Sequence, residues 1–190
     1  MTREELVQKV LSLGADHAGI VPVDQVPFQP EYRKMCESNT CGRYGKYWSC
    51  PPDIGPADEL IARAKTYGWA LVYQTIGELE DSLDIEGMQR AGERMRDMTY
   101  LVREALEPEL GPGALYLGTG GCPLCEECTR PSGEPCRFPD KIIPSVSAYA
   151  LDMSRLAKRA GMSYTNGTNT VTYFGVVFFS EKGDCTKCQP

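Results

Sequence analysis

The chain has 190 residues, of which 42% are hydrophobic and 24% are charged, and its 20 basic and 26 acidic side chains give a net charge of −6. A chain of this size can form one domain without disulfides or a metal. The acidic balance, with no basic stripe, argues against a nucleic-acid partner. No apolar run approaches the roughly 20 residues that cross a bilayer. Because the acidic N-terminus does not resemble a signal peptide, we expect a cytoplasmic protein without a membrane partner.

Hydrophobic periodicity predicts alternating helices and strands along the chain. Thr2 can cap an amphipathic helix that stops at Gly14, and a long helix ends before Pro108. The strand before this long helix and the short strand after it predict a βαβ crossover with a parallel strand pair. The expected helices cover about residues 2–14, 56–68, 84–107 and 144–161, and the expected strands cover about residues 18–23, 69–76, 114–117 and 171–179.

Two segments without periodicity interrupt this pattern, at about residues 36–52 and 118–139, and both are rich in Gly, Pro and Cys. We therefore expect a single domain over residues 1–190, of mixed α/β class, with a mixed sheet of about four to five strands. The two cysteine-rich segments are expected to be loops at its edge.

The nine cysteines are an odd number, which excludes a fully disulfide-paired protein. In a reducing compartment, clustered cysteines indicate a metal site or redox chemistry. Cys122, Cys125 and Cys128 follow one another at intervals of three, and Cys136 lies eight residues further on. This spacing lets the backbone wrap its thiolates and N–H groups around a [4Fe–4S] cluster. Structural zinc sites more often use two separated Cys pairs, so zinc is the alternative metal.

A second group comprises Cys36, Cys41 and Cys50, which can hold three corners of a second [4Fe–4S] cluster. Without a fourth protein ligand, the remaining iron could bind a small-molecule substrate, as in an enzyme. Alternatively, Cys185 or Cys188 of the C-terminal CTKC sequence could close the site. That pair is equally compatible with a redox couple, a frayed dithiol or half of a zinc site.

Two sequence blocks carry a resemblance to a known family, namely CESNTCGRYGKYWSCPP and CPLCEECTRPSGEPCRFP. With their flanking elements they resemble an uncharacterised prokaryotic family of predicted metal-binding proteins, a domain of unknown function common in anaerobes. The similarity covers nearly the whole chain, although Cys185 and Cys188 are not part of the pattern. The resemblance implies a cysteine-bound metal centre of iron–sulfur type, without an established reaction or catalytic residues.

These observations lead to three hypotheses about function. The first is an iron–sulfur protein that transfers electrons to a partner redox enzyme in anaerobic metabolism. The second is an enzyme that binds and transforms a small substrate at an open iron held by Cys36, Cys41 and Cys50. The third is a zinc-stabilised interaction module. The sequence alone does not decide whether the protein is an enzyme.

Overall fold

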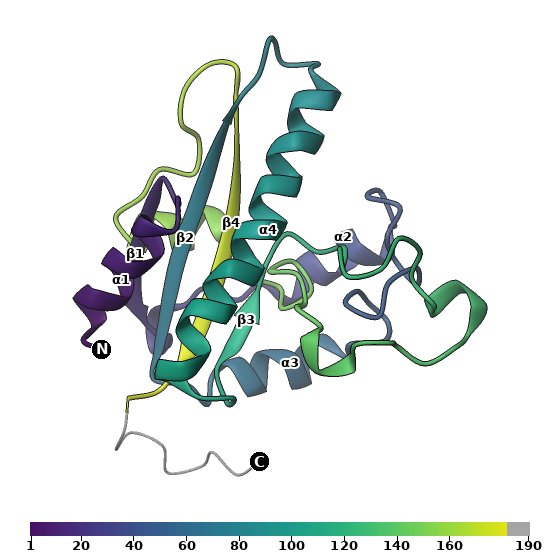
Figure 1. The fold of residues 1–190 in the computed structure, drawn as a ribbon, viewed down its shortest axis with the longest axis horizontal. Helices are drawn as coiled ribbons and strands as arrows, with labels where there is room; N and C mark the ends of the chain where they lie inside the picture. The colour runs from purple at the N-terminus through teal and green to yellow at the C-terminus, as the bar shows by residue number, and fades with distance from the viewer. Residues whose placement is uncertain (182–190) are drawn as a thin grey trace.

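The computed structural model describes residues 1–181, and these form an α/β fold with one four-stranded sheet, as expected from the sequence. The C-terminal pair Cys185 and Cys188 lies outside the described residues. The elements in chain order are α1 (Arg3–Ser12), β1 (His17–Pro22), α2 (Arg33–Glu37), α3 (Ala57–Ala64), β2 (Trp69–Glu78), α4 (Ile85–Leu110), β3 (Leu115–Leu117), α5 (Met153–Arg159) and β4 (Thr170–Phe179), arranged as in Figure 1.

The strand order in the sheet is β1-β2-β4-β3, and each pair of neighbouring strands is antiparallel. The prediction that two neighbouring strands pair in parallel is therefore wrong for the described strands. β2, α4 and β3 do form a β-α-β unit, but β4 lies between the two strands and pairs with both. This is a split β-α-β arrangement. The local sequence suggested the crossover and could not reveal a strand inserted from the far end of the chain.

The sheet is covered on both faces, because alternate residues of each strand point to opposite sides. Leu71 and Tyr73 of β2 face α1 and α4, and Ala70 and Val72 face α3 and α5. α1 contributes Leu6 and Val10 to the first face, together with Met95, Met98, Val102 and Leu106 of α4. Among the described residues, no helix is both long and apolar enough to cross a membrane.

Three local predictions need correction. The helix expected over residues 144–161 is confined to α5, because Ala150 has a φ of +53° and the Asp152 side chain caps a new helix at the Arg155 N–H. The expected loop 36–52 begins with Cys36 inside the short helix α2. α4 continues past Pro108 to Leu110, since a proline in the last turn removes only one hydrogen bond.

Candidate metal centre

The cysteine loop over residues 118–139 begins at the end of β3, and hydrogen bonds hold its two ends together. The Gly118 N–H donates to the Pro144 carbonyl, and the Val146 N–H donates to the Gly118 carbonyl, both at 2.9 Å. A parallel bridge joins Gly118 to Ser145 at the same place. The chain between these points therefore projects as a closed loop beside α4, next to the segment that contains α2 (Figure 1). We call residues 36–52 and 118–139 together the loop lobe.

The four cysteines of this loop line one small cavity, as their spacing predicts. Their neighbours in its wall include Trp48 and Ser49 from the other loop and Phe138 and Ile142 from the chain that follows. All four thiols are free and half-buried. The cysteines that share the cavity are Cys122, Cys125, Cys128 and Cys136.

Hydrogen-bond donors surround these sulfurs. The Phe138 N–H donates to Cys136 Sγ at 3.4 Å, and the Tyr100 hydroxyl lies 3.7 Å from Cys122 Sγ. Interaction with Cys125 raises the pKa of the Arg137 guanidinium, which donates to the Glu127 carbonyl at 3.0 Å. Burial raises the pKa of Tyr100, and the nearby Cys122 thiolate raises it further. Tyr100 therefore stays protonated and can donate to a thiolate, which is the environment that sulfur ligands of a metal require.

The second group, Cys36, Cys41 and Cys50, lies in the other half of the loop lobe. Burial raises the pKa of Cys36 and of Cys50, and for each of them nearby thiolates add to the effect. These two thiols are protonated at neutral pH until a metal replaces the proton. Each of these two thiols is therefore close enough to its group to be affected by the others, and Cys41 is the exposed member.

The two cysteine groups meet at the turn Gly120-Gly121. The Gly121 N–H acts on the Cys50 thiol and partly offsets the effect of burial on its pKa. Arg43 donates to the Gly120 carbonyl at 3.1 Å. Further along, Trp48 Nε1 donates to Thr129 Oγ1 at 3.1 Å, so the two loops are held together at more than one point. Spacing alone could not predict this contact, because it joins residues that are far apart in the sequence.

A glycine-to-alanine change tests how closely the turn Gly120-Gly121 packs against Ser145. Gly120 has a φ of +77°, and a Cβ there would lie 2.9 Å from Ser145 Cβ. Gly133, in the same loop, has a φ of +75° and nothing within 4 Å of its Cβ position. We expect Gly133→Ala to lower the free energy of unfolding by about 1 kcal/mol and Gly120→Ala by about 3 kcal/mol. Urea unfolding followed by circular dichroism measures both, and equal losses would contradict a close packing of the turn.

Arg33 is a buried cation beside the second cysteine group, and the sequence carried no signal for it. The side chain is 8% exposed and donates to the Ala148 carbonyl at 2.8 Å and to the Gly55 carbonyl at 2.7 Å. No carboxylate of residues 1–181 forms an ion pair with it. Its charge lowers the pKa of Cys36, against the larger effect of burial. A buried, unpaired guanidinium is costly, so an anionic partner is expected next to it.

The donor set fits a group held by thiolates. Within residues 1–181, no three His, Cys, Asp or Glu side chains converge on a position where they could hold one metal ion. Cys122, Cys125, Cys128 and Cys136 nevertheless line a common cavity with hydrogen-bond donors at their sulfurs. A single zinc ion needs its sulfurs at about 2.3 Å. A cubane cluster instead takes one thiolate at each of four separate corners, so its ligands surround a larger volume.

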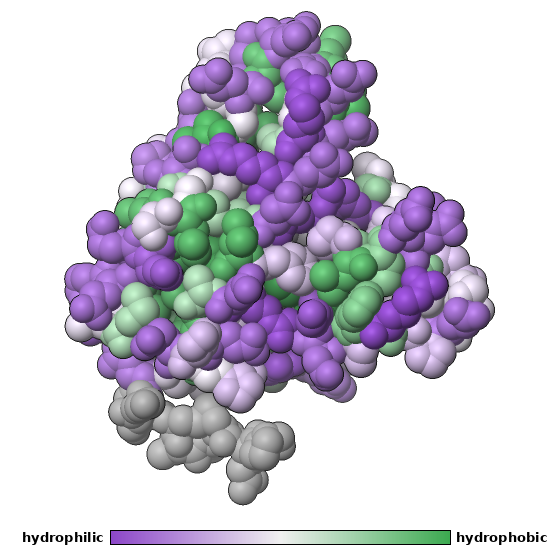
Figure 2. Space-filling model, in the orientation of Figure 1, coloured by the Kyte–Doolittle hydropathy of each residue, from purple (hydrophilic) through white to green (hydrophobic). Residues whose placement is uncertain are grey.

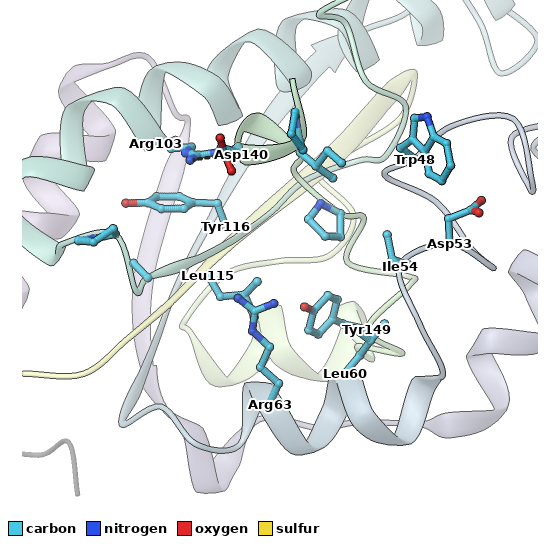
Figure 3. A pocket seen from close by; sticks show the side chains of 15 residues that line it. Trp48, Asp53, Ile54, Leu60, Arg63, Arg103, Leu115, Tyr116, Asp140 and Tyr149 are labelled. Atoms are coloured by element: carbon cyan, nitrogen blue, oxygen red, sulfur yellow. Dashed lines mark hydrogen bonds between the residues drawn. The ribbon is translucent and has the colours of Figure 1, made fainter. Parts of the chain in front are cut away.

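A second pocket adjoins the four-cysteine cavity, and Trp48 and Ile142 line both. Figure 3 shows Trp48 at one end, Arg103 and Asp140 toward the other, and Arg63 rising from α3. Arg103 donates to the Asp140 carbonyl at 2.7 Å. The pocket contains two arginines and two aspartates, Asp53 being the second, so their charges cancel.

Comparison with known proteins places this geometry in a family. Residues 19–179 match the family described as "Predicted metal-binding protein (DUF2284)". The chain belongs to this family. The match includes all seven described cysteines and confirms the family expected from the two sequence blocks. No curated protein and no solved structure matches the chain significantly. What this DUF2284 protein binds must therefore be argued from its own residues.

Proposed function

We propose that this protein binds two [4Fe–4S] clusters and transfers electrons to a partner redox enzyme in anaerobic metabolism. The first cluster is assigned to Cys122, Cys125, Cys128 and Cys136, and the second to Cys36, Cys41 and Cys50. The observation that carries the proposal is the single cavity that the first four cysteines line, with donors at its sulfurs. All seven described cysteines are free thiols, as expected in a reducing cytoplasm.

The charges around the second group support its assignment. Thiolates on an iron–sulfur core carry net negative charge, and Arg33 is a buried cation with no carboxylate partner among the described residues. The Gly121 N–H and Arg43 both act on Cys50 in the direction that favours its thiolate. These groups would stabilise bound thiolates that burial alone would disfavour.

The chain's own residues determine how such a centre could work. The clusters would supply reversible one-electron chemistry. Trp48 and Phe138 cover the four-cysteine cavity and limit its contact with water. Tyr100 and the Phe138 N–H hold hydrogen bonds to two of the sulfurs. The pocket next to Trp48 brings a redox partner's group close to the cavity (Figure 3).

An enzymatic role is the second candidate, and one observation favours it. Among the described residues, only three cysteines belong to the second group, so one corner of a cubane there has no described protein ligand. An iron with one coordination position free of protein ligands could bind a small substrate there. Loss of the second cluster in a Cys185→Ser, Cys188→Ser double variant would instead identify the tail as its fourth ligand and oppose this role.

Metal analysis of anaerobically purified protein tests the proposed function. We expect a brown protein with about eight iron and eight sulfide per chain, corresponding to two [4Fe–4S] clusters, and about half of each if only one forms. Stoichiometric zinc in a colourless protein would overturn the proposal in favour of a zinc-stabilised module. Electron paramagnetic resonance of the dithionite-reduced protein distinguishes one reduced cluster from two.

A further inference from the structure

A pocket between α4 and the loop lobe is not used by either cysteine group. Its wall includes Arg43 from the loop lobe, Gln89 and Arg96 from α4, and Thr119 from the chain just after β3. Figure 2 shows that hydrophilic side chains run along α4 toward the loop lobe on the face drawn there. The pocket thus lies where a polar helix surface meets the metal-binding loops.

The charged side chains of this pocket leave an excess of positive charge. Arg96 pairs with Glu93 at 3.6 Å, and Glu93 is the only acidic side chain in the wall. Arg43 is half-buried, donates one hydrogen bond to the Gly120 carbonyl and forms no ion pair with residues 1–181. One cationic charge is therefore uncompensated at a partly dehydrated position, where it attracts an anion more strongly than in water.

Thr119 provides an independent observation. Its Oγ1 atom is buried and has no hydrogen-bond partner among the described residues. Buried hydroxyls in proteins are nearly always hydrogen-bonded, and an unpaired one costs about 1–3 kcal/mol. Its position in the wall beside two guanidinium groups suits an acceptor-rich ligand, since a hydroxyl and both arginines can all donate to oxygen atoms.

We propose that this pocket binds the carboxylate or phosphate group of a small-molecule substrate and holds the substrate beside the second cysteine group. The placement rests on the proposed function, because Arg43 joins the pocket to the metal centre. Its guanidinium carbon lies 3.3 Å from the position that a Cβ would occupy at Gly121, and its charge lowers the pKa of Cys50. An anion held by Arg43, Arg96 and Thr119 would thus lie near the second cysteine group.

Calorimetric titration of the anaerobically purified protein with inorganic phosphate, and separately with acetate, tests the pocket. We expect saturable binding of at least one anion, and the stronger one identifies the group that the pocket prefers. Arg96→Gln should weaken binding about tenfold, because it removes a charged hydrogen bond, and Thr119→Val should weaken it severalfold. Arg90→Gln is the matched control, since Arg90 lies on the same helix, is exposed and does not line the pocket.

The same titration of chelator-treated protein separates this inference from the proposed function. Arg96 and Thr119 are not metal ligands, so binding should persist even if metal analysis finds zinc or no metal. Absence of saturable binding by either anion, or equal weakening by Arg90→Gln and Arg96→Gln, would overturn the inference. A shift in the paramagnetic resonance of the second cluster on adding the anion, lost in Arg96→Gln, would support its position beside that centre.

Discussion

Replacing Cys125 with alanine is expected to remove about half of the bound iron and sulfide. Cys125 lines the four-cysteine cavity and interacts with Arg137. All four thiolates of this cavity are assigned to the first cluster, so loss of one should destabilise and release that cluster while leaving the second. Iron and sulfide analysis of anaerobically purified protein measures the loss, and electron paramagnetic resonance shows which cluster remains.

Glu126→Gln is the control for this change. Glu126 is the next residue in the same loop and is exposed to solvent. We expect wild-type iron and sulfide content in this variant. If Cys125→Ala also retains its full iron content, the four cysteines do not act as one site, and the assignment of the first cluster is wrong.

Replacing Arg33 with methionine should destabilise the metal-loaded protein much more than the metal-free protein. In the loaded protein the change removes the buried cation next to Cys36 and leaves an anionic centre uncompensated, which should cost about 3 kcal/mol. In the metal-free protein the same change also relieves an unpaired buried charge. The free energy of unfolding should then fall by only about 1 kcal/mol, because the carbonyls of Gly55 and Ala148 lose their hydrogen-bond donor.

Urea unfolding before and after anaerobic chelation measures this difference. Arg33→Lys separates charge from hydrogen bonding, because it keeps the cation but cannot reproduce both guanidinium hydrogen bonds. In the loaded protein, we expect the free energy of unfolding of Arg33→Lys to lie between those of wild type and Arg33→Met. If Arg33→Met has the same effect with and without metal, Arg33 is a structural residue with no electrostatic link to the cysteines.

The sequence predicted the elements well where local signals dominate. Thr2 and Glu5 form the capping box that starts α1. The apolar spacing of α4 correctly predicts burial of Met95, Met98, Val102 and Leu106, whereas Ile85 and Leu101 are exposed. Failures occurred where long-range contacts decide the structure. β4 separates β2 from β3 because it pairs with both, and the segment before Asp152 is held by bridges to Phe28 and Gly118 instead of forming a helix.

The candidate site was predictable to a similar extent. The intervals between Cys122, Cys125 and Cys128 predict a shared cavity because neighbouring ligands on one loop are a local property. The contact of Gly121 with Cys50 and the buried Arg33 depend on two loops meeting in space. Arginine and glycine are common residues, and nothing in their local sequence distinguishes these from any others.

The insertion of β4 between β2 and β3 has a consequence for synthesis on the ribosome. β4 is the last strand to be translated, yet it joins two strands that were completed much earlier. Until residue 179 leaves the exit tunnel, β3 lacks the strand with which it pairs in the described sheet. A premature stop before residue 170 would therefore remove an inner strand of the sheet and leave two exposed edges prone to aggregation.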